Sequence, residues 1–326
     1  MKVTAAMIHR DIRLKGLLMR LFAKPISEGR SRKNLAKLAK RNDSFFPAFA
    51  QMEKIHISRS DGSKMRTLIL KPQNAKANLP GVLFLHGGGY IGGSPEEKIW
   101  FAERLIAMEE CVVVSPDYSL APYRPYPAAV EDAYLALLWL RDNAAKLGAN
   151  LDQLFVVGES AGGGLAASLA IYARDRGEVN VAFQMPLFPM LDDQMQTDSM
   201  RDNNAPIWNE KSNRVAWQLY LGDLFGNPEV PAYAAPVRLA DFDGLPPAYT
   251  YVGTIDPFYD ETRIYFEKLQ AAGIEANIDF YEGCFHAFDE VAANTDIAKR
   301  CNENIKVAFR HACKTYFASQ SRDSII

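Results

Sequence analysis

The chain has 326 residues, of which 48% are hydrophobic and 23% are charged, and its formal net charge is −2. This length and composition are typical of a globular protein with one large or two medium domains. A net charge of −2 gives no basic footprint, so no nucleic-acid partner is expected. The cysteines are too few for a disulfide framework and lack metal-finger or C-x-x-C spacing, which favours a reducing compartment. They are Cys111, Cys284, Cys301 and Cys313.

Residues 1–50 alternate basic with apolar side chains and end in the aromatic stretch Phe45–Phe49. This pattern predicts one or two helices, which we expect to pack as a lid over the body of the protein, with contact of the amphipathic start with a membrane surface as the alternative. The segment has neither an uninterrupted apolar core nor a small-residue cleavage site, so it does not resemble a secretory signal. No later stretch reaches the roughly 18 uninterrupted apolar residues of a membrane span. We therefore expect no stable membrane insertion and a cytoplasmic location.

The next part of the chain predicts an edge hairpin followed by buried strands and helices. Residues 54–58 alternate with period two, Asp61-Gly62 is a turn signal, and residues 65–71 form the second strand. Continuous apolar runs then predict strands that are covered on both faces. These strands are residues 80–86, 111–115, 154–157 and 181–185, and the helices between them are expected around 96–109, 128–147 and 165–171.

The alternation of strand and helix breaks between residues 190 and 235, which are rich in Asp, Asn, Trp and Met and have helical signals around 210–221. It resumes with strands at 248–252 and 276–281 and helices at 259–272 and 290–317. This order predicts an α/β fold with a doubly wound, mostly parallel sheet. We expect residues 51–189 and 236–326 to form its main domain. Residues 1–50 and the 190–235 insertion would form a cap at the carboxyl ends of the strands, where such sheets bind ligands.

The stretch Gly158-Glu159-Ser160-Ala161-Gly162 follows a strand and precedes a helix, which is the context of a G-x-S-x-G nucleophile elbow. Glycines are needed there because a Cβ on either flank of the strained serine would collide with the adjoining strand or helix. The elbow presents the Ser160 hydroxyl above the sheet, at the N-terminus of a helix. The alternative interpretation is a glycine-rich helix start with an incidental serine.

A serine nucleophile needs a base, and the base needs an orienting acid, which in this fold follow in the order Ser, acid, His. His286 follows the last predicted strand in a loop, whereas His311 lies in the middle of the final helix and is expected at the surface. Asp256 follows the strand 248–252, and we predict that it is the acid. An N-cap role for Asp256 before Pro257 is compatible with this, and Asp260 and Glu261 are rivals.

His86-Gly87-Gly88-Gly89 lies between a buried strand and a helix, the position of the glycine loop whose N–H groups stabilise an oxyanion in lipases and esterases. We assign the oxyanion donors to the backbone of Gly88, Gly89 and Ala161, and expect His86 to brace the loop. A merely flexible glycine run is the alternative. Tyr90, Phe188 and Trp208 are the candidate substrate-binding residues of an apolar pocket beneath the cap.

These motifs, with DYSLAP…PYPAAVEDA at 117–133 and Asp256-Pro257, resemble the hormone-sensitive-lipase-like (bacterial family IV) carboxylesterases of the α/β-hydrolase fold. The resemblance runs from about residue 55 to 290. It implies a serine carboxylesterase without metal or cofactor that hydrolyses small-molecule esters of short or medium acyl chains. It also implies a cap built from the N-terminal helices and an insertion after the sixth strand.

Four positions depart from the family pattern. Glu159 stands where Asp is frequent, Ser119 and Tyr123 replace an Arg and a Glu, and Ala287 replaces a glycine after the histidine. None of these departures removes Ser160, Asp256 or His286. The alternatives are an amidase or deacetylase on the same fold and a non-catalytic small-ligand receptor. The sequence leaves open the physiological substrate and whether the chain forms a homodimer.

Overall fold

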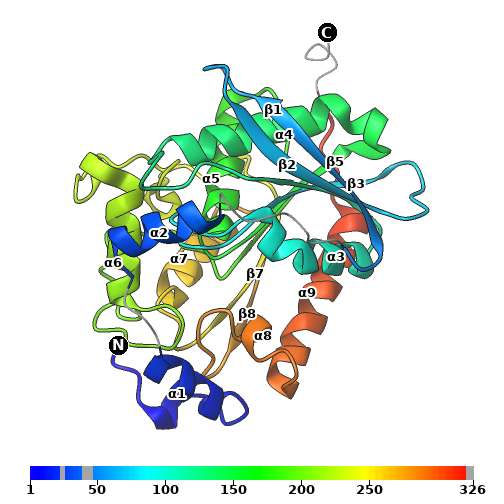
Figure 1. Ribbon diagram of the computed structural model, residues 1–326. Coiled ribbons are helices and arrows are strands. Elements are labelled where there is room, and N and C mark those ends of the chain that lie inside the picture. The colour runs from blue at the N-terminus through cyan, green and yellow to red at the C-terminus, as the bar shows by residue number, and fades with distance from the viewer. Residues whose placement is uncertain (23–25, 39–46, 321–326) are drawn as a thin grey trace.

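The computed structural model describes residues 1–22, 26–38 and 47–320, and its centre is an eight-stranded sheet with helices on both faces (Figure 1). The strand order is β1-β2-β4-β3-β5-β6-β7-β8. Strands β3 to β8 run parallel, while β1 and β2 are antiparallel to their neighbours. The strands are β1 (Ala50–Ser58), β2 (Lys64–Pro72), β3 (Leu79–Leu85), β4 (Val112–Pro116), β5 (Ala149–Glu159), β6 (Phe183–Leu187), β7 (Ala248–Gly253) and β8 (Ala276–Tyr281). The predicted α/β class with a mostly parallel sheet is confirmed.

The helices follow the expected alternation with strands, and their boundaries differ from the expected ones by a few residues. The helix expected at 96–109 starts with a 3₁₀ turn at Pro95–Lys98, and the one expected at 290–317 is divided between α8 and α9. The helices are α1 (Arg13–Phe22), α2 (Glu28–Leu38), α3 (Ile99–Met108), α4 (Ala128–Leu147), α5 (Ala161–Arg176), α6 (Glu210–Leu221), α7 (Tyr259–Ala271), α8 (Phe288–Val291) and α9 (Asp296–Thr315).

Strand β3 shows why the central strands read as continuous apolar runs. All seven of its residues are buried, because helices cover both faces of the sheet. Successive side chains alternate between the faces. Leu83 and Leu85 pack in one core with α4 and α5, and Val82 and Phe84 pack in the opposite core with α3 and α9. The two cores therefore fix the register of the sheet whose carboxyl edge carries the candidate site.

Residues from the N-terminal segment contact the insertion that follows β6. The amine of Met1 donates a hydrogen bond to the carbonyl of Asp198 at 2.8 Å, and the N–H of Val3 donates to Asn204 Oδ1 at 2.7 Å. Helices α1, α2 and α6 belong to these two segments (Figure 1). These contacts join the two segments that we expect to form the cap.

The aromatic stretch Phe45–Phe49 of the expected lid is described only in part. Phe45 and Phe46 lie outside the described residues. Phe49 is 46% exposed, and its N–H donates to Glu103 Oε1 of α3 at 2.8 Å.

Candidate active site

Ser160 lies in the turn between β5 and α5, with φ 56° and ψ −119°. A residue with a Cβ rarely adopts such a backbone conformation, so the turn is strained. Gly162 allows the turn to close, because a Cβ there would collide with the backbone oxygens of Leu85 and His86 at the end of β3. The turn therefore holds the serine at the carboxyl edge of the sheet, beside the free N–H groups of the first turn of α5.

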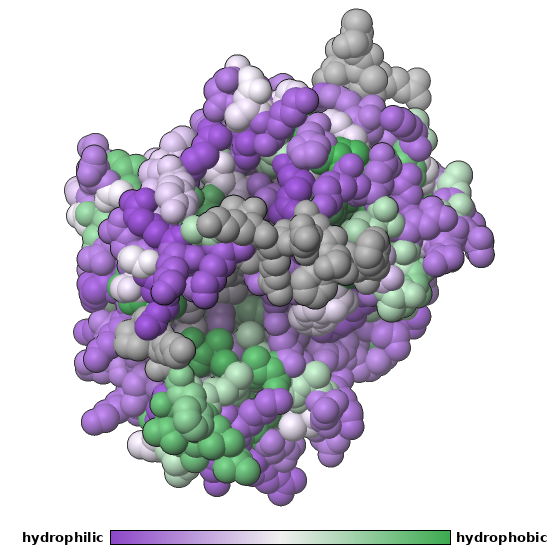
Figure 2. Space-filling model, in the orientation of Figure 1, coloured by the Kyte–Doolittle hydropathy of each residue, from purple (hydrophilic) through white to green (hydrophobic). Residues whose placement is uncertain are grey.

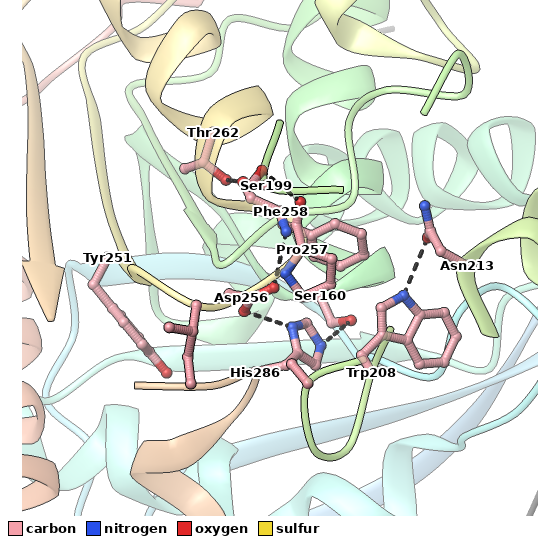
Figure 3. Close-up of polar contacts among 12 residues, drawn as sticks. Ser160, Ser199, Trp208, Asn213, Tyr251, Asp256, Pro257, Phe258, Thr262 and His286 are labelled. Carbon is pink, nitrogen blue, oxygen red and sulfur yellow. Dashed lines mark hydrogen bonds and ion pairs between the residues drawn. The ribbon is translucent and has the colours of Figure 1, made fainter. Parts of the chain in front are cut away.

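His286 lies in the loop between β8 and α8 and contacts the serine directly (Figure 3). Its Nε2 atom is 2.8 Å from Ser160 Oγ, and its Nδ1 atom is 2.9 Å from Asp256 Oδ2. The exposed fractions of Ser160, His286 and Asp256 are 8%, 4% and 1%. A buried chain of hydrogen bonds therefore joins Ser160, His286 and Asp256, the three residues selected by their order in the sequence.

The two oxygens of Asp256 have different partners. Oδ2 faces His286, whereas Oδ1 accepts a hydrogen bond from the N–H of Phe258 at 2.9 Å (Figure 3). The second bond fixes the rotation of the carboxylate, so that Oδ2 stays directed at the imidazole. The expected N-cap role of Asp256 is wrong, because α7 begins at Tyr259 and its N-cap position is Phe258. The bond from Phe258 N–H instead forms an Asx turn just before the helix.

The rival residues lie elsewhere. Asp260 Oδ2 accepts from the N–H of Ser199 at 2.8 Å, and Glu261 Oε1 accepts from the N–H of Leu191 at 2.6 Å. Both carboxylates thereby hold the insertion onto α7. The side chain of His311 is 54% exposed on α9. None of these three residues has a contact with Ser160 among the described hydrogen bonds.

The glycine loop after β3 lies against the elbow. A Cβ on Gly87 would be 3.4 Å from the Cβ of Ser160. Gly88 and Gly89 have φ values of 129° and 65°, which favour glycine. Among the described residues, the N–H groups of Gly88 and Gly89 donate no hydrogen bond to another residue. Ala161 opens α5, where N–H groups have no partner within the helix. These three N–H groups are therefore available to an anionic ligand atom.

His86 braces this loop, as expected. Its Nδ1 atom is 2.8 Å from the carbonyl of Gly87, and its ring stacks on Tyr118 with centroids 4.3 Å apart. The Tyr118 hydroxyl donates to the His86 carbonyl at 2.7 Å. Burial lowers the pKa of the His86 imidazole, so it acts as a neutral spacer.

Aromatic rings enclose the imidazole of His286. The ring centroids of Phe188, Phe258 and Trp208 lie 4.9, 5.1 and 6.2 Å from it. Trp208 also covers the glycine loop, because a Cβ on Gly89 would be 2.5 Å from its ring. Phe188 and Trp208, two of the candidate substrate-binding residues, thus lie beside the imidazole. Phe258 is a third ring that sequence reasoning missed, although its position two residues after Asp256 could have indicated it.

Tyr90 lies in a different environment. Its ring is fully buried and stacks on Tyr220 of α6, with centroids 3.8 Å apart. No ring contact between Tyr90 and His286 occurs among the described residues. The tyrosine therefore joins the glycine loop to the cap helix.

An ion cluster unforeseen from the sequence lies behind the elbow. Lys98 Nζ is 3.0 Å from Glu159 Oε2 and 2.6 Å from Glu290 Oε1. Burial and then the neighbouring Glu159 raise the pKa of Glu290 to about 8. Burial lowers the pKa of Lys98, but the two carboxylates outweigh it and the net shift is upward. Lys98 therefore links the residue before Ser160 to the helix that follows His286.

The departures from the family pattern have local explanations. Ser119 Oγ donates to Asp132 Oδ2 at 2.6 Å, and Arg59 Nε donates to Asp132 Oδ1 at 2.6 Å, so the buried carboxylate is paired without an arginine at position 119. Tyr123 is 56% exposed. Ala287 has φ 54°, in the left-handed region, which explains why a glycine suits this position.

Within the described parts of the chain, no group of three or more His, Cys, Asp or Glu side chains is arranged to hold a metal ion.

Comparisons with known proteins match most of the chain. A family model for the alpha/beta hydrolase fold matches residues 82–290, a range that includes Ser160, Asp256 and His286. Esterase LipI of Mycobacterium tuberculosis is 35% identical over 237 residues, which are 72% of this chain and 73% of LipI. Carboxylesterase NlhH of the same organism is 34% identical over 220 residues, 67% of this chain and 69% of NlhH. A solved bacterial heroin esterase is similar with a TM-score of 0.84 at 28% identity, over 95% of this chain and 99% of that chain.

Proposed function

This chain belongs to the hormone-sensitive-lipase-like (family IV) carboxylesterases of the alpha/beta hydrolase fold, and we propose that it hydrolyses short- to medium-chain acyl esters through Ser160, His286 and Asp256. The 2.8 Å contact between Ser160 Oγ and His286 Nε2 carries this proposal. It supports proton transfer because a general base must lie within hydrogen-bond reach of the proton that it removes.

In the acylation step, His286 Nε2 removes the proton of Ser160 Oγ as this oxygen attacks the carbonyl carbon of the ester. The tetrahedral intermediate has a negative oxygen, which the N–H groups of Gly88, Gly89 and Ala161 stabilise. Each such donor contributes about 3 kcal/mol to lowering the barrier. The carbonyl forms again when the C–O bond to the alcohol breaks, and the imidazolium gives its proton to the leaving alcohol oxygen.

Deacylation repeats the chemistry with water. His286 takes a proton from a water molecule that attacks the acyl-serine, and the carboxylic acid leaves as Ser160 recovers its proton. Asp256 keeps the Nδ1–H tautomer of the imidazole and stabilises its positive charge in both steps. The fixed carboxylate supports this role, because its other oxygen is held by Phe258 N–H.

The acyl group would bind among Phe188, Trp208 and neighbouring apolar side chains beneath the cap. Trp208 comes from the 190–235 insertion and lies over Gly89, which limits the space beside the oxyanion donors. Tyr90 would act on the pocket through its stack with Tyr220 rather than by direct contact. We expect the closely packed aromatic wall to favour acyl chains of about C2 to C6, because a pocket discriminates each methylene by roughly 1–3 kcal/mol.

Initial rates on p-nitrophenyl esters from C2 to C12 test this function, with Ser160→Ala as the matched variant. The wild type should have its highest kcat/KM on short chains, and Ser160→Ala should lose about four orders of magnitude or more. Hydrolysis by wild type and variant at equal rates would refute the role of Ser160, and a maximum at C12 would refute the predicted chain length. The matching p-nitroanilide series separates an amidase from an esterase. A wild type inactive on every ester and anilide would refute the hydrolase proposal and favour the non-catalytic receptor.

A further inference from the structure

Helix α1 carries an apolar stripe that faces solvent. Leu14, Leu18, Leu21 and Phe22 are 73%, 47%, 75% and 73% exposed, although each is a large apolar side chain. Their spacing of i, i+4, i+7 and i+8 puts them on one face of the helix. Figure 2 shows the resulting hydrophobic area where α1 lies in Figure 1. An apolar patch of this kind marks a surface that binds another apolar surface.

The opposite face of α1 contacts the loop that carries His286, which directs the apolar stripe to solvent. A Cβ on Gly16 would be 2.7 Å from the ring of Phe285, the residue before His286. Ile12, immediately before the helix, is fully buried in the core with Phe285. Arg20 Nη1 donates to the Val3 carbonyl at 3.2 Å and holds the helix to the segment that precedes it. The stripe is therefore a stable feature of the surface.

The N-terminal segment that carries the stripe is basic. Residues 1–22 contain five basic residues and one acidic residue, Asp11, whereas the whole chain has 37 basic and 39 acidic residues. Lys2, Arg10 and Lys15 are exposed, and α1 itself contains no Asp or Glu. Arg10 lies 3.5 Å from Asp11, but its side chain remains 87% exposed. A basic margin beside an exposed apolar stripe is complementary to a surface with anionic head groups and an apolar interior.

We propose that α1 adsorbs to the surface of anionic phospholipid membranes, with its apolar stripe among the acyl chains and its basic residues at the head groups. The ten-residue helix is about 15 Å long and lies in the plane of the interface rather than across it. Among the described residues, no helix is long and apolar enough to cross a membrane. Adsorption brings the loop of Phe285 and His286 close to the membrane surface.

A second copy of the chain fits the patch less well. A two-fold dimer through α1 would place the same patch on both sides of the interface. Lys2, Arg10 and Lys15 of one copy would then approach those of the other, and like charges across an interface repel. Anionic head groups instead attract all three.

Co-sedimentation with phospholipid vesicles tests the proposal without measuring turnover. The full chain is mixed with vesicles of phosphatidylglycerol and phosphatidylcholine in equal parts, or with pure phosphatidylcholine. One variant combines Leu14→Gln, Leu18→Gln and Leu21→Gln, which removes three of the four apolar side chains of the stripe but keeps good helix formers. The other combines Arg10→Gln and Lys15→Gln. Val307→Gln is the matched control, since Val307 is 60% exposed on the distant α9 (Figure 1).

The wild type and Val307→Gln should bind the anionic vesicles and bind pure phosphatidylcholine much less. The leucine variant should bind about tenfold or more weakly, and the basic variant should lose about fivefold for each charge removed. Equal thermal midpoints show that the variants are folded. Failure of the wild type to bind, or equal binding by all variants, would overturn the proposal. So would a dimer in sedimentation velocity that the leucine variant dissociates while vesicle binding is absent.

Discussion

Replacing Asp256 by Asn tests the proposed acid more sharply than removing it does. In the wild type, Oδ1 accepts the N–H of Phe258 and Oδ2 faces His286 Nδ1, both at 2.9 Å. The Asn amide must direct its oxygen at Phe258, because the reverse orientation puts N–H against N–H. An unpaired buried N–H costs about 1–3 kcal/mol. The Asn NH₂ group therefore faces His286 Nδ1.

This orientation forces the imidazole into the wrong tautomer. Nδ1 must accept from the Asn NH₂ group, so the proton lies on Nε2, which then donates to Ser160 Oγ and cannot remove its proton. Enforcing this tautomer in a Ser-His-Asp site lowers kcat by about 10⁴-fold. At 1.36 kcal/mol per decade, this corresponds to a barrier higher by roughly 5.4 kcal/mol.

The assay is kcat and KM on p-nitrophenyl butyrate, with Asp260→Asn as the matched control. Asp260 lies four residues away at the start of α7 and accepts from Ser199 N–H instead of from His286. Its variant should keep kcat within about tenfold of the wild type, with any loss coming from the stability of the insertion. A fall in kcat of less than tenfold in Asp256→Asn, or a larger fall in Asp260→Asn, would refute the assignment of Asp256.

Two further predictions come from contacts around the site. Gly16→Leu should push the Phe285 ring, 2.7 Å from a Cβ at position 16, and lower kcat about tenfold or more, because displacement of the adjacent His286 is costly. Leu18→Ala, on the exposed face of α1, should leave kcat unchanged, and equal values for both variants would contradict the coupling. Glu290→Gln should alter the pH dependence of unfolding. The pKa of Glu290 is raised to about 8, so the native state keeps a proton that the unfolded chain releases near pH 4.5. The free energy of unfolding of the wild type therefore falls as pH rises from about 4.5 to 8. The variant should gain thermal stability relative to wild type as pH rises from about 4.5 to 8, and a stability difference that is constant with pH would contradict the raised pKa.

Much of the site could be predicted because it depends on local steric rules. The turn around Ser160 needs Gly162 close to the end of β3, and such constraints leave a recognisable motif. Chain order then selected Asp256 and His286, since loops after successive parallel strands meet at one edge of the sheet. The alternation of strands and helices could also be predicted from local sequence. A central strand is buried on both faces, so it appears as a continuous apolar run.

The contacts that sequence reasoning missed join positions far apart with no periodic pattern. Arg59 and Asp132 are 73 residues apart, and Lys98 and Glu290 are 192 apart. Nothing in the local sequence of either pair indicates its partner, because charged residues are common on any surface. The contact between Gly16 and Phe285 depends likewise on how α1 crosses the histidine loop, which tertiary packing alone decides.

Mass spectrometry after reaction with a small fluorophosphonate ester tests the central proposal most directly, because the reagent labels only a serine that an adjacent base activates. The proposal predicts one phosphonyl group per chain, on the peptide that contains Ser160, and labelling at least a hundredfold slower in His286→Ala. Labelling of Ser160 at the same rate in His286→Ala, or labelling of a different residue, would contradict the proposed mechanism.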